Sequence, residues 1–370
     1  MAKDVKYVYG VITGGKATSF GPIGIGDQGD EVHTVAYKDL AAVVSDCPPI
    51  DYTAVKDTDN EKVVRDLAAH QRLIEEVMKR STILPMKFGT TVKDKDEVEA
   101  ILRRGYFSLK EALAATEGKV EVELVATWDV DSVTQEIAQE EPIARLRARI
   151  EKTKSRLRSV PDRVKVGKMV YESLGRRREN YQEEVLGALT TFALDLQKNV
   201  LMDDKMVMNV AFLISKDRQE EFDDKVSEVD ERLGGALNFR VIGPLPAYSF
   251  STIDVRLLTR QEIAEARGML GIDEEGSGLT EIKAAYYQLA QEHHPDLKPG
   301  DEEAEERFTR IASAYQLLTS YCLGAAAAQG ITAKKQAERY RCSFVPPAVN
   351  EAMLITIKRA GEVMTKSQLA

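Results

Sequence analysis

Alternating and helical apolar patterns predict a mixed α and β structure in the first third of the chain. Short runs of β-branched and aromatic residues are typical of strands, whereas apolar residues three and four positions apart are typical of helices that cover a sheet. The glycine-rich stretch 14–30 is typical of a loop. The elements that we expect are strands at 6–13, 32–44 and 82–92, with a hairpin inside the second run, and helices at 61–79 and 94–115.

The middle third repeats this mixture with longer helices. Residues 120–130 alternate between apolar and polar side chains, as a half-buried strand does. Pro161 separates two long helical patterns, so we expect a helical hairpin here, because proline breaks the interior of a helix. The order of strand, helices, strand, helix and strand is typical of a split α+β sandwich. The further elements that we expect are helices at 133–158, 163–200 and 219–233 and strands at 205–215 and 239–242.

The pattern becomes almost purely helical from about residue 259 to residue 321. Two helices there carry apolar stripes that predict an antiparallel pair, and the loop between them contains His294, Pro295 and Asp296. The stripes consist of Ile282, Ala285, Tyr286 and Leu289 on the first helix and of Phe308, Ile311, Ala312, Tyr315 and Leu318 on the second.

These patterns divide the chain into four parts. We expect an N-terminal α+β domain at 1–117, a second α+β domain with the helical hairpin at 118–257, a helical domain at 258–321 and a tail at 322–370. The expected fold class is therefore α+β, with two domains of ferredoxin-like or related topology followed by an all-α module. The pattern does not assign a fold to the tail.

Composition and charge narrow the possible functions. The formal net charge of -9 argues against a role in gripping nucleic acid, because phosphate binding needs a basic surface. No uncharged apolar run approaches the ~20 residues that cross a bilayer, and the N-terminus lacks the pattern of a secretory signal.

The three cysteines, Cys47, Cys322 and Cys342, are far apart and lack metal-ligand spacing. We expect three reduced thiols in a cytoplasmic protein, with no metal and no cofactor.

One glycine-rich stretch and one histidine raise the question of catalysis. Residues 10–18 nearly match the phosphate-binding pattern G-x-x-x-x-G-K-[ST], but Ala17 stands where a hydroxyl group should hold magnesium. His70 lies on the apolar stripe of the first helix, where a lone histidine is more often a core residue than a catalytic base. Trp128 is expected to anchor a core or an interface. We therefore expect no enzymatic activity. A nucleotide-dependent enzyme remains as an alternative to the two non-enzymatic functions considered below.

The triplet of His294, Pro295 and Asp296 suits recognition, because proline sharpens the turn while two polar side chains project from its tip. Residues 269–320 resemble the J-domain of DnaJ-type co-chaperones in spacing, triplet and apolar pattern together. The resemblance implies that the triplet stimulates ATP hydrolysis by a DnaK-type chaperone. J-domains carry a basic face on the helix before the triplet, whereas this face offers only Lys283 among glutamines and a glutamate. The alternative is a helical pair retained for packing.

Several stretches between residues 6 and 250 resemble the GvpL/GvpF family of gas vesicle proteins. They are YVYGVI, LAAVVSD, HQRLIEEVMKRSTILPMKFGTTV, VGKMVYESLGRRRENY and FRVIGPLPAYSF, in this order. The resemblance implies a two-domain α+β protein that helps to build gas vesicles, the protein-walled gas compartments of certain prokaryotes. Such a protein would be an accessory or minor shell-associated protein, in the cytoplasm or at the gas vesicle. It implies contact with the small hydrophobic shell subunit and with other gas vesicle accessory proteins, and no enzymatic activity.

The hypothesis that follows is a cytoplasmic protein of gas vesicle assembly. An apolar shell subunit needs a partner that shields it before assembly, and a J-like domain would recruit a chaperone to it. Met86, Phe88 and Phe107 are the residues that we expect to contact the subunit. The alternative is a DnaJ-type co-chaperone whose α+β body selects other clients. The sequence leaves open whether the protein stays in the finished wall, whether it self-associates and what the tail does.

Overall fold

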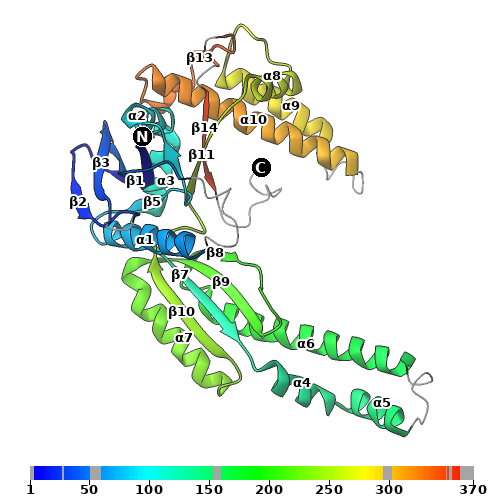
Figure 1. The fold of residues 1–370 in the computed structure, drawn as a ribbon. Coiled ribbons are helices and arrows are strands. Elements are labelled where there is room, and N and C mark those ends of the chain that lie inside the picture. Colours follow the sequence, from blue (N-terminus) through cyan, green and yellow to red (C-terminus); the bar gives the residue numbers. More distant parts are fainter. Residues whose placement is uncertain are drawn as a thin grey trace. The chain divides into compact units, whose positions relative to one another are not determined.

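The computed structural model describes residues 4–26, 29–50, 60–152, 160–294, 302–346, 348–349 and 352–358. Two compact units form: residues 1–117 together with 246–370, and residues 118–245. Figure 1 shows their ribbons. Each unit combines antiparallel strands with helices, which confirms the predicted α+β class. The finer division into four parts stays a prediction.

A six-stranded antiparallel sheet forms the centre of the first unit. Its strands are β1 (Val5–Thr13), β2 (Ser19–Pro22), β3 (Glu31–Tyr37), β4 (Leu40–Cys47), β5 (Ile83–Pro85) and β6 (Thr91–Val92). They lie in the order β2-β3-β4-β1-β5, and β6 also pairs with β1. Lys38, with a positive φ of 55°, makes the turn of the predicted hairpin between β3 and β4. Gly10 lets β5 approach β1, because a Cβ atom there would lie 2.5 Å from the Leu84 carbonyl oxygen.

Helices cover both faces of this sheet. Successive side chains of a strand point to opposite faces, so Tyr7 of β1 joins the core under α1 (Asn60–Met78), and Val8 joins the core under α2 (Lys95–Arg104) and α3 (Tyr106–Thr116). Both side chains are fully buried. The helices predicted at 61–79 and 94–115 are therefore confirmed, except that the second one breaks into α2 and α3.

The first unit also contains a two-stranded ribbon, to which the tail contributes one strand. Strand β11 (Thr252–Leu257) pairs with β14 (Met353–Lys358) in antiparallel register. An isolated parallel bridge joins Ile253 to Met86, directly after β5, and the Lys87 N–H donates to the Ile253 carbonyl oxygen at 2.9 Å. The tail to which the sequence assigned no fold thus contributes β14.

The predicted helical domain consists of α8 (Arg260–Leu270), α9 (Leu279–His293) and α10 (Glu302–Ala328), which share one apolar core. Helix α10 continues past the predicted end at residue 321 and packs against α2. Gly324 permits this contact, because a Cβ atom there would lie 3.2 Å from the Arg104 carbonyl oxygen. The helical domain is thereby joined to the N-terminal sheet.

A four-stranded antiparallel sheet forms the second unit. Its strands are β7 (Lys119–Thr127), β8 (Ala193–Lys198), β9 (Met206–Ser215) and β10 (Asn238–Leu245), in the order β10-β7-β9-β8. The helices are α4 (Val130–Ala138), α5 (Glu141–Lys152), α6 (Val160–Leu189) and α7 (Gln219–Leu233). Figure 1 shows α5 and α6 running side by side beyond the end of the sheet, as the predicted helical hairpin requires.

Two predictions for the second unit are wrong in detail. The helix predicted at 163–200 ends at Leu189 and is followed by β8, because apolar residues in this stretch fit both a helical and an alternating period. The helix predicted at 133–158 is interrupted before α5. Pro142 has no N–H group to bond the carbonyl of Ala138, so α4 ends there and a new helix begins.

The expectation of three reduced thiols is also wrong. Cys322 on α10 and Cys342 on a short strand of the tail form a disulfide. Cys47 is a free and buried cysteine. The pairing depends on how the tail folds back onto α10, and the spacing of the cysteines does not indicate it.

Candidate functional site

The two most exposed large apolar side chains in the described part of the chain follow strand β8. Val200 and Met202 are each 84% exposed, and Leu194 on β8 itself is 57% exposed. Strand β8 is an edge of its sheet and, among the described residues, pairs with β9 alone. We call these three side chains and the outer edge of β8 the β8 apolar edge. Contiguous exposed apolar surface marks sites of protein–protein contact, and we take the β8 apolar edge as the candidate for such a site.

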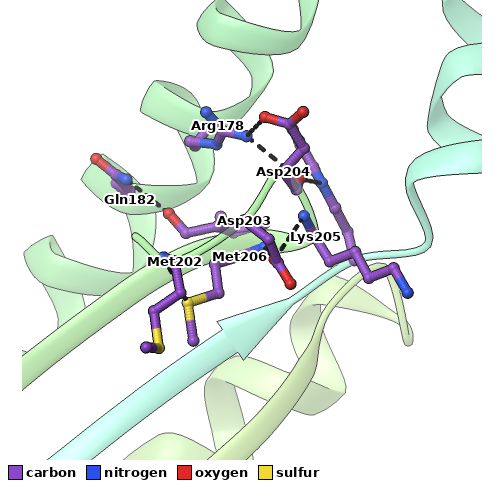
Figure 2. Close-up of polar contacts among 9 residues, drawn as sticks. Arg178, Gln182, Met202, Asp203, Asp204, Lys205 and Met206 are labelled. Carbon is purple, nitrogen blue, oxygen red and sulfur yellow. Dashed lines mark hydrogen bonds and ion pairs between the residues drawn. The ribbon is translucent and has the colours of Figure 1, made fainter. Parts of the chain in front are cut away.

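The loop after β8 is held in a defined conformation by its own hydrogen bonds (Figure 2). The Asp203 carboxylate accepts from the backbone N–H groups of Lys205 and Met206 at 2.9 Å and 3.1 Å, which closes a turn. The N–H group of Met202 lies 3.3 Å from the sulfur of Met206, and Figure 2 shows the two thioether side chains beside each other. The exposed side chains are therefore carried by an ordered turn.

Helix α6 and the residue after β7 anchor the same loop. Trp128 donates from its indole Nε1 to the Asp204 carbonyl oxygen at 2.9 Å, and Arg178 donates to the same oxygen at 3.3 Å. The Arg178 guanidinium also lies over the Trp128 ring, 5.6 Å from its centre. Gln182 donates to the carbonyl oxygen of Val207 at 2.6 Å, at the start of β9 and directly after the loop. A loop fixed in this way loses little conformational entropy when a partner binds it.

The side chains predicted to contact the shell subunit do not form one exposed patch. Met86 is 1% exposed and belongs to the core between the sheet and α3. Phe107 packs against this core from its rim. Phe88 is partly buried with its ring edge against His70, at 5.5 Å between ring centres. A partner could reach Met86 only after the core had opened, and the predicted contact stays a prediction.

His70 is a core residue, as expected for a lone histidine on an apolar stripe. Its Nδ1 atom forms a hydrogen bond with the Tyr7 hydroxyl at 3.0 Å, and the side chain is buried. Burial lowers the pKa of His70 to about 4. The imidazole is therefore neutral at physiological pH and stabilises the core rather than serving as an exposed base.

The loop with the triplet begins at the end of α9. The His294 ring meets the Phe308 ring edge at 5.4 Å between centres, so the first residue of the triplet is placed against α10. Pro295 and Asp296 lie outside the described residues. On the exposed face of α9, the Lys283 ammonium group lies 5.6 Å from the centre of the Tyr287 ring. A single lysine on this face makes it weakly basic, as the sequence indicated.

A cleft of about 790 Å³ in the first unit does not assemble a catalytic group. Its wall is formed by α10, β14, Ser108 and Arg256, and several of the lining residues are serine or threonine. Arg256 and Lys358 reach this wall, but each is paired with a carboxylate, Glu262 and Asp254 respectively. Catalysis requires a nucleophile or a base with an orienting partner, and the described lining residues do not provide this combination.

The near match to a phosphate-binding loop lies in a strand and the loop after it. Residues 10–13 belong to β1, the Gly14 N–H donates to the Asp39 carbonyl oxygen at 2.9 Å, and the chain continues into β2. A phosphate-binding loop instead leads into a helix whose N–H groups face the phosphates. Within the described ranges, no group of His, Cys, Asp and Glu residues is placed to hold a metal ion. No helix among the described residues has the length and apolarity to cross a membrane.

Gas vesicle proteins of several prokaryotes are similar to about two thirds of the chain. The gas vesicle protein F of a Streptomyces species is 29% identical over 248 residues, which cover 66% of this chain and 98% of the relative. Gas vesicle protein F1 of Halobacterium salinarum is 25% identical over 236 residues, which cover 63% and 86%. The crystal structure of the gas vesicle protein GvpF from an Anabaena species has a TM-score of 0.57 at 20% identity and covers 66% and 97%. This structural likeness supports the fold described above.

The helical module has relatives of its own. Residues 268–321 match the model of the DnaJ domain, and a chaperone protein DnaJ from Synechococcus elongatus is 44% identical over 59 residues, which cover 16% of this chain and 20% of that protein. The larger match is to the family model described as gas vesicle synthesis protein GvpL/GvpF, over residues 5–252. The chain therefore belongs to the GvpL/GvpF family of gas vesicle proteins and carries a DnaJ domain after the family region.

Proposed function

We propose that this protein binds the small hydrophobic shell subunit of the gas vesicle through the β8 apolar edge and keeps it soluble until assembly. The single observation that carries the proposal is the exposure of Val200 and Met202 on a loop fixed by hydrogen bonds. Burying one such side chain contributes roughly 1.5–3 kcal/mol. Two of them, together with Leu194, would supply a substantial part of the binding free energy.

The edge of β8 adds a second kind of contact. An edge strand presents backbone N–H and C=O groups that can pair with an extended segment of another chain. Backbone pairing is tolerant of sequence, whereas the exposed methionine adapts its shape to an apolar partner. A cytoplasmic subunit that would otherwise aggregate is a partner that fits both properties.

We propose a second role, chaperone recruitment, for the DnaJ domain. We expect it to recruit a DnaK-type chaperone to the bound subunit through His294 and the neighbouring residues 295 and 296, with Lys283 assisting the encounter. The weakly basic face of α9 favours slow docking, because complementary charge mainly raises association rates. On this proposal the protein is an assembly factor that works in the cytoplasm and at the growing gas vesicle, and it performs no catalysis of its own.

Co-purification of the shell subunit with the tagged full chain tests the binding site. The double variant Val200→Asp and Met202→Asp is expected to lose capture by at least roughly tenfold, because buried carboxylates replace buried apolar groups. The matched control is Val64→Asp with Leu257→Asp, at side chains 65% and 71% exposed in the first unit. It should capture the subunit as the wild type does. Equal capture by both variants, or equal loss, would contradict the proposed site.

Chaperone recruitment needs a separate assay. The variant His294→Gln is expected to lose stimulation of a DnaK-type ATPase while it still captures the subunit. His293→Gln, at the last residue of α9, is the matched control and should keep both activities. A wild-type protein that stimulates the ATPase but captures no subunit would replace the proposal with the co-chaperone alternative.

A further inference from the structure

A short segment of the tail folds back onto the DnaJ domain. Its residues 341–344, which we call the clasp, begin with β13 (Arg341–Cys342), and β13 pairs with β12 (Ser277–Gly278) directly before α9. Cys342 is bonded through its sulfur to Cys322 on α10. The clasp thus holds the start of α9 and the body of α10, the two helices between which the triplet loop lies.

Polar contacts tie the clasp to the first turn of α9. Arg341 donates to the Glu281 carboxylate at 2.7 Å and to the Gly276 carbonyl oxygen at 2.9 Å. Glu281 also accepts from the Gly278 N–H at 3.0 Å and from the Ser277 hydroxyl at 2.8 Å. These bonds, that from the Gly278 N–H foremost, lower the pKa of Glu281. One carboxylate therefore caps α9 and receives the clasp.

The disulfide belongs to the buried core of the helical domain, together with Tyr321 and Phe344. Phe344 stacks on Tyr321 at 5.4 Å between ring centres, and the Tyr321 hydroxyl donates to the Ser343 carbonyl oxygen at 2.7 Å. The Arg267 guanidinium of α8 lies over the Phe344 ring, 5.8 Å from its centre. Both cysteines of the disulfide are buried. A reductant can reach the sulfur atoms only when the clasp has opened.

We infer that Cys322 and Cys342 form a redox-modified site whose reduction by a dithiol releases the clasp from the DnaJ domain. One thiolate of the dithiol attacks a protein sulfur, which forms a mixed disulfide and expels the other cysteine as a thiolate. The second thiol of the reductant then attacks the mixed disulfide. The protein gains two electrons and two protons and holds two thiols, and the reductant leaves as a disulfide.

Cys47 does not compete in this exchange. It lies in the core between the six-stranded sheet and α1. Burial raises the pKa of its thiol to about 12. Exchange requires a thiolate, so Cys47 stays inert at physiological pH. The redox state of Cys322 and Cys342 affects the stability of α9 and α10 independently of shell-subunit binding and chaperone recruitment.

The rate of reduction measures the opening of the clasp. The full chain is oxidised with oxidised glutathione and transferred to dithiothreitol. Samples are quenched at intervals with a maleimide in denaturant, which labels every free thiol including Cys47, and are weighed by mass spectrometry. Two thiols are expected to appear together. Arg341→Ala removes the bonds to Glu281 and Gly276, so its reduction should be roughly threefold faster, as the loss of an exposed ion pair permits. Arg339→Ala, an exposed arginine two residues away, is the control and should react like the wild type.

Amide hydrogen exchange reports what the clasp holds. In the reduced protein, exchange at residues 277–282 should be at least roughly tenfold faster, because β12 and the cap of α9 lose their support. Exchange in β9 of the second unit should not change. The double variant Cys322→Ser and Cys342→Ser should behave as the reduced protein. If this variant does not fold, the reduction rate of Arg341→Ala still tests the inference.

Two outcomes would overturn the inference. Three free thiols after treatment with oxidised glutathione would show that the disulfide does not form in solution. Equal exchange at residues 277–282 in the oxidised and the reduced protein would show that the disulfide has no hold on α9. Neither outcome depends on a shell subunit or a chaperone, so neither bears on the proposed function.

Discussion

Two sets of apolar side chains in this protein look alike in sequence and differ in exposure. Met86, Phe88 and Phe107 in the first unit are packed into or against its cores, whereas the β8 apolar edge of the second unit faces solvent. A strand-like apolar run is therefore a poor guide to a binding surface. What decides exposure is whether another segment of the chain covers the run.

The covering segment of the first unit is distant in sequence. Met86 is bridged by Ile253 of β11, and β11 is in turn paired with β14 at the end of the chain. The loop after β8, by contrast, has Trp128 and Arg178 beneath its backbone and nothing among the described residues over Val200. Substitutions in the two sets should therefore affect different quantities.

The largest effect is expected for Met86→Ala. Removing a fully buried side chain leaves a cavity, so the free energy of unfolding should fall by about 4 kcal/mol. Denaturant titration measures it, and the folded fraction should capture the shell subunit as the wild type does. A loss of capture with unchanged stability would return this residue to the binding surface.

The buried His70 beside Phe88 should make stability depend on pH. Its pKa is about 4 in the folded protein and about 6.5 in the unfolded chain. The unfolded chain therefore takes up a proton first, and the free energy of unfolding should fall by about 3 kcal/mol as the pH drops from about 6.5 to about 4. Above this window the effect is absent.

Denaturant titrations at pH 7 and pH 4.5 compare the wild type with His70→Gln, which cannot take up the proton. The wild type should lose more stability than the variant between these two pH values. Equal losses would mean that His70 is not buried as the structure has it.

A smaller effect on stability is expected for Arg178→Ala, which acts on the β8 apolar edge from beneath. The variant loses the hydrogen bond to the Asp204 carbonyl oxygen and the contact with the Trp128 ring, together worth about 1 kcal/mol. Capture should weaken although Arg178 does not belong to the edge, because the loop loses its support. Lys168→Ala on the same helix, at an exposed position, should change neither quantity. Full capture by Arg178→Ala would show that loop support is irrelevant.

The smallest change in stability is expected for Met202→Ala. An exposed side chain contributes little to folding, so the free energy of unfolding should stay within about 0.5 kcal/mol of the wild type. Affinity for the subunit should nevertheless fall roughly tenfold, as measured by titration of labelled subunit. A stability loss without an affinity loss would place Met202 among the core residues.

The sequence predicted the fold class, the hairpin of β3 and β4, and the paired helices of the DnaJ domain. These features depend on local periodicity, and Tyr286 and Phe308 lie in the core where the stripes placed them. The break before α5 depends on Pro142. The apolar residues on both sides of this proline keep a helical spacing, so the pattern predicted one continuous helix. Strand β8 was missed because its short apolar run also fits a helix.

The candidate sites were harder to predict than the fold. Val200 and Met202 fell at and just beyond the end of a predicted helix, so no pattern marked them as exposed. The disulfide of Cys322 and Cys342 joins α10 to a segment without periodicity. Both features result from contacts between segments, which the spacing of residues along one chain does not encode.

Site-specific photocrosslinking tests whether the β8 apolar edge binds the shell subunit. A photoreactive amino acid is placed at Met202 or, as the control, at Leu257, which is 71% exposed in the other unit. Each protein is mixed with the gas vesicle shell subunit and irradiated, and the products are identified by mass spectrometry. We expect a crosslink to the subunit from position 202 and none from position 257. Crosslinks from position 257 in the absence of any from position 202 would contradict binding at the β8 apolar edge.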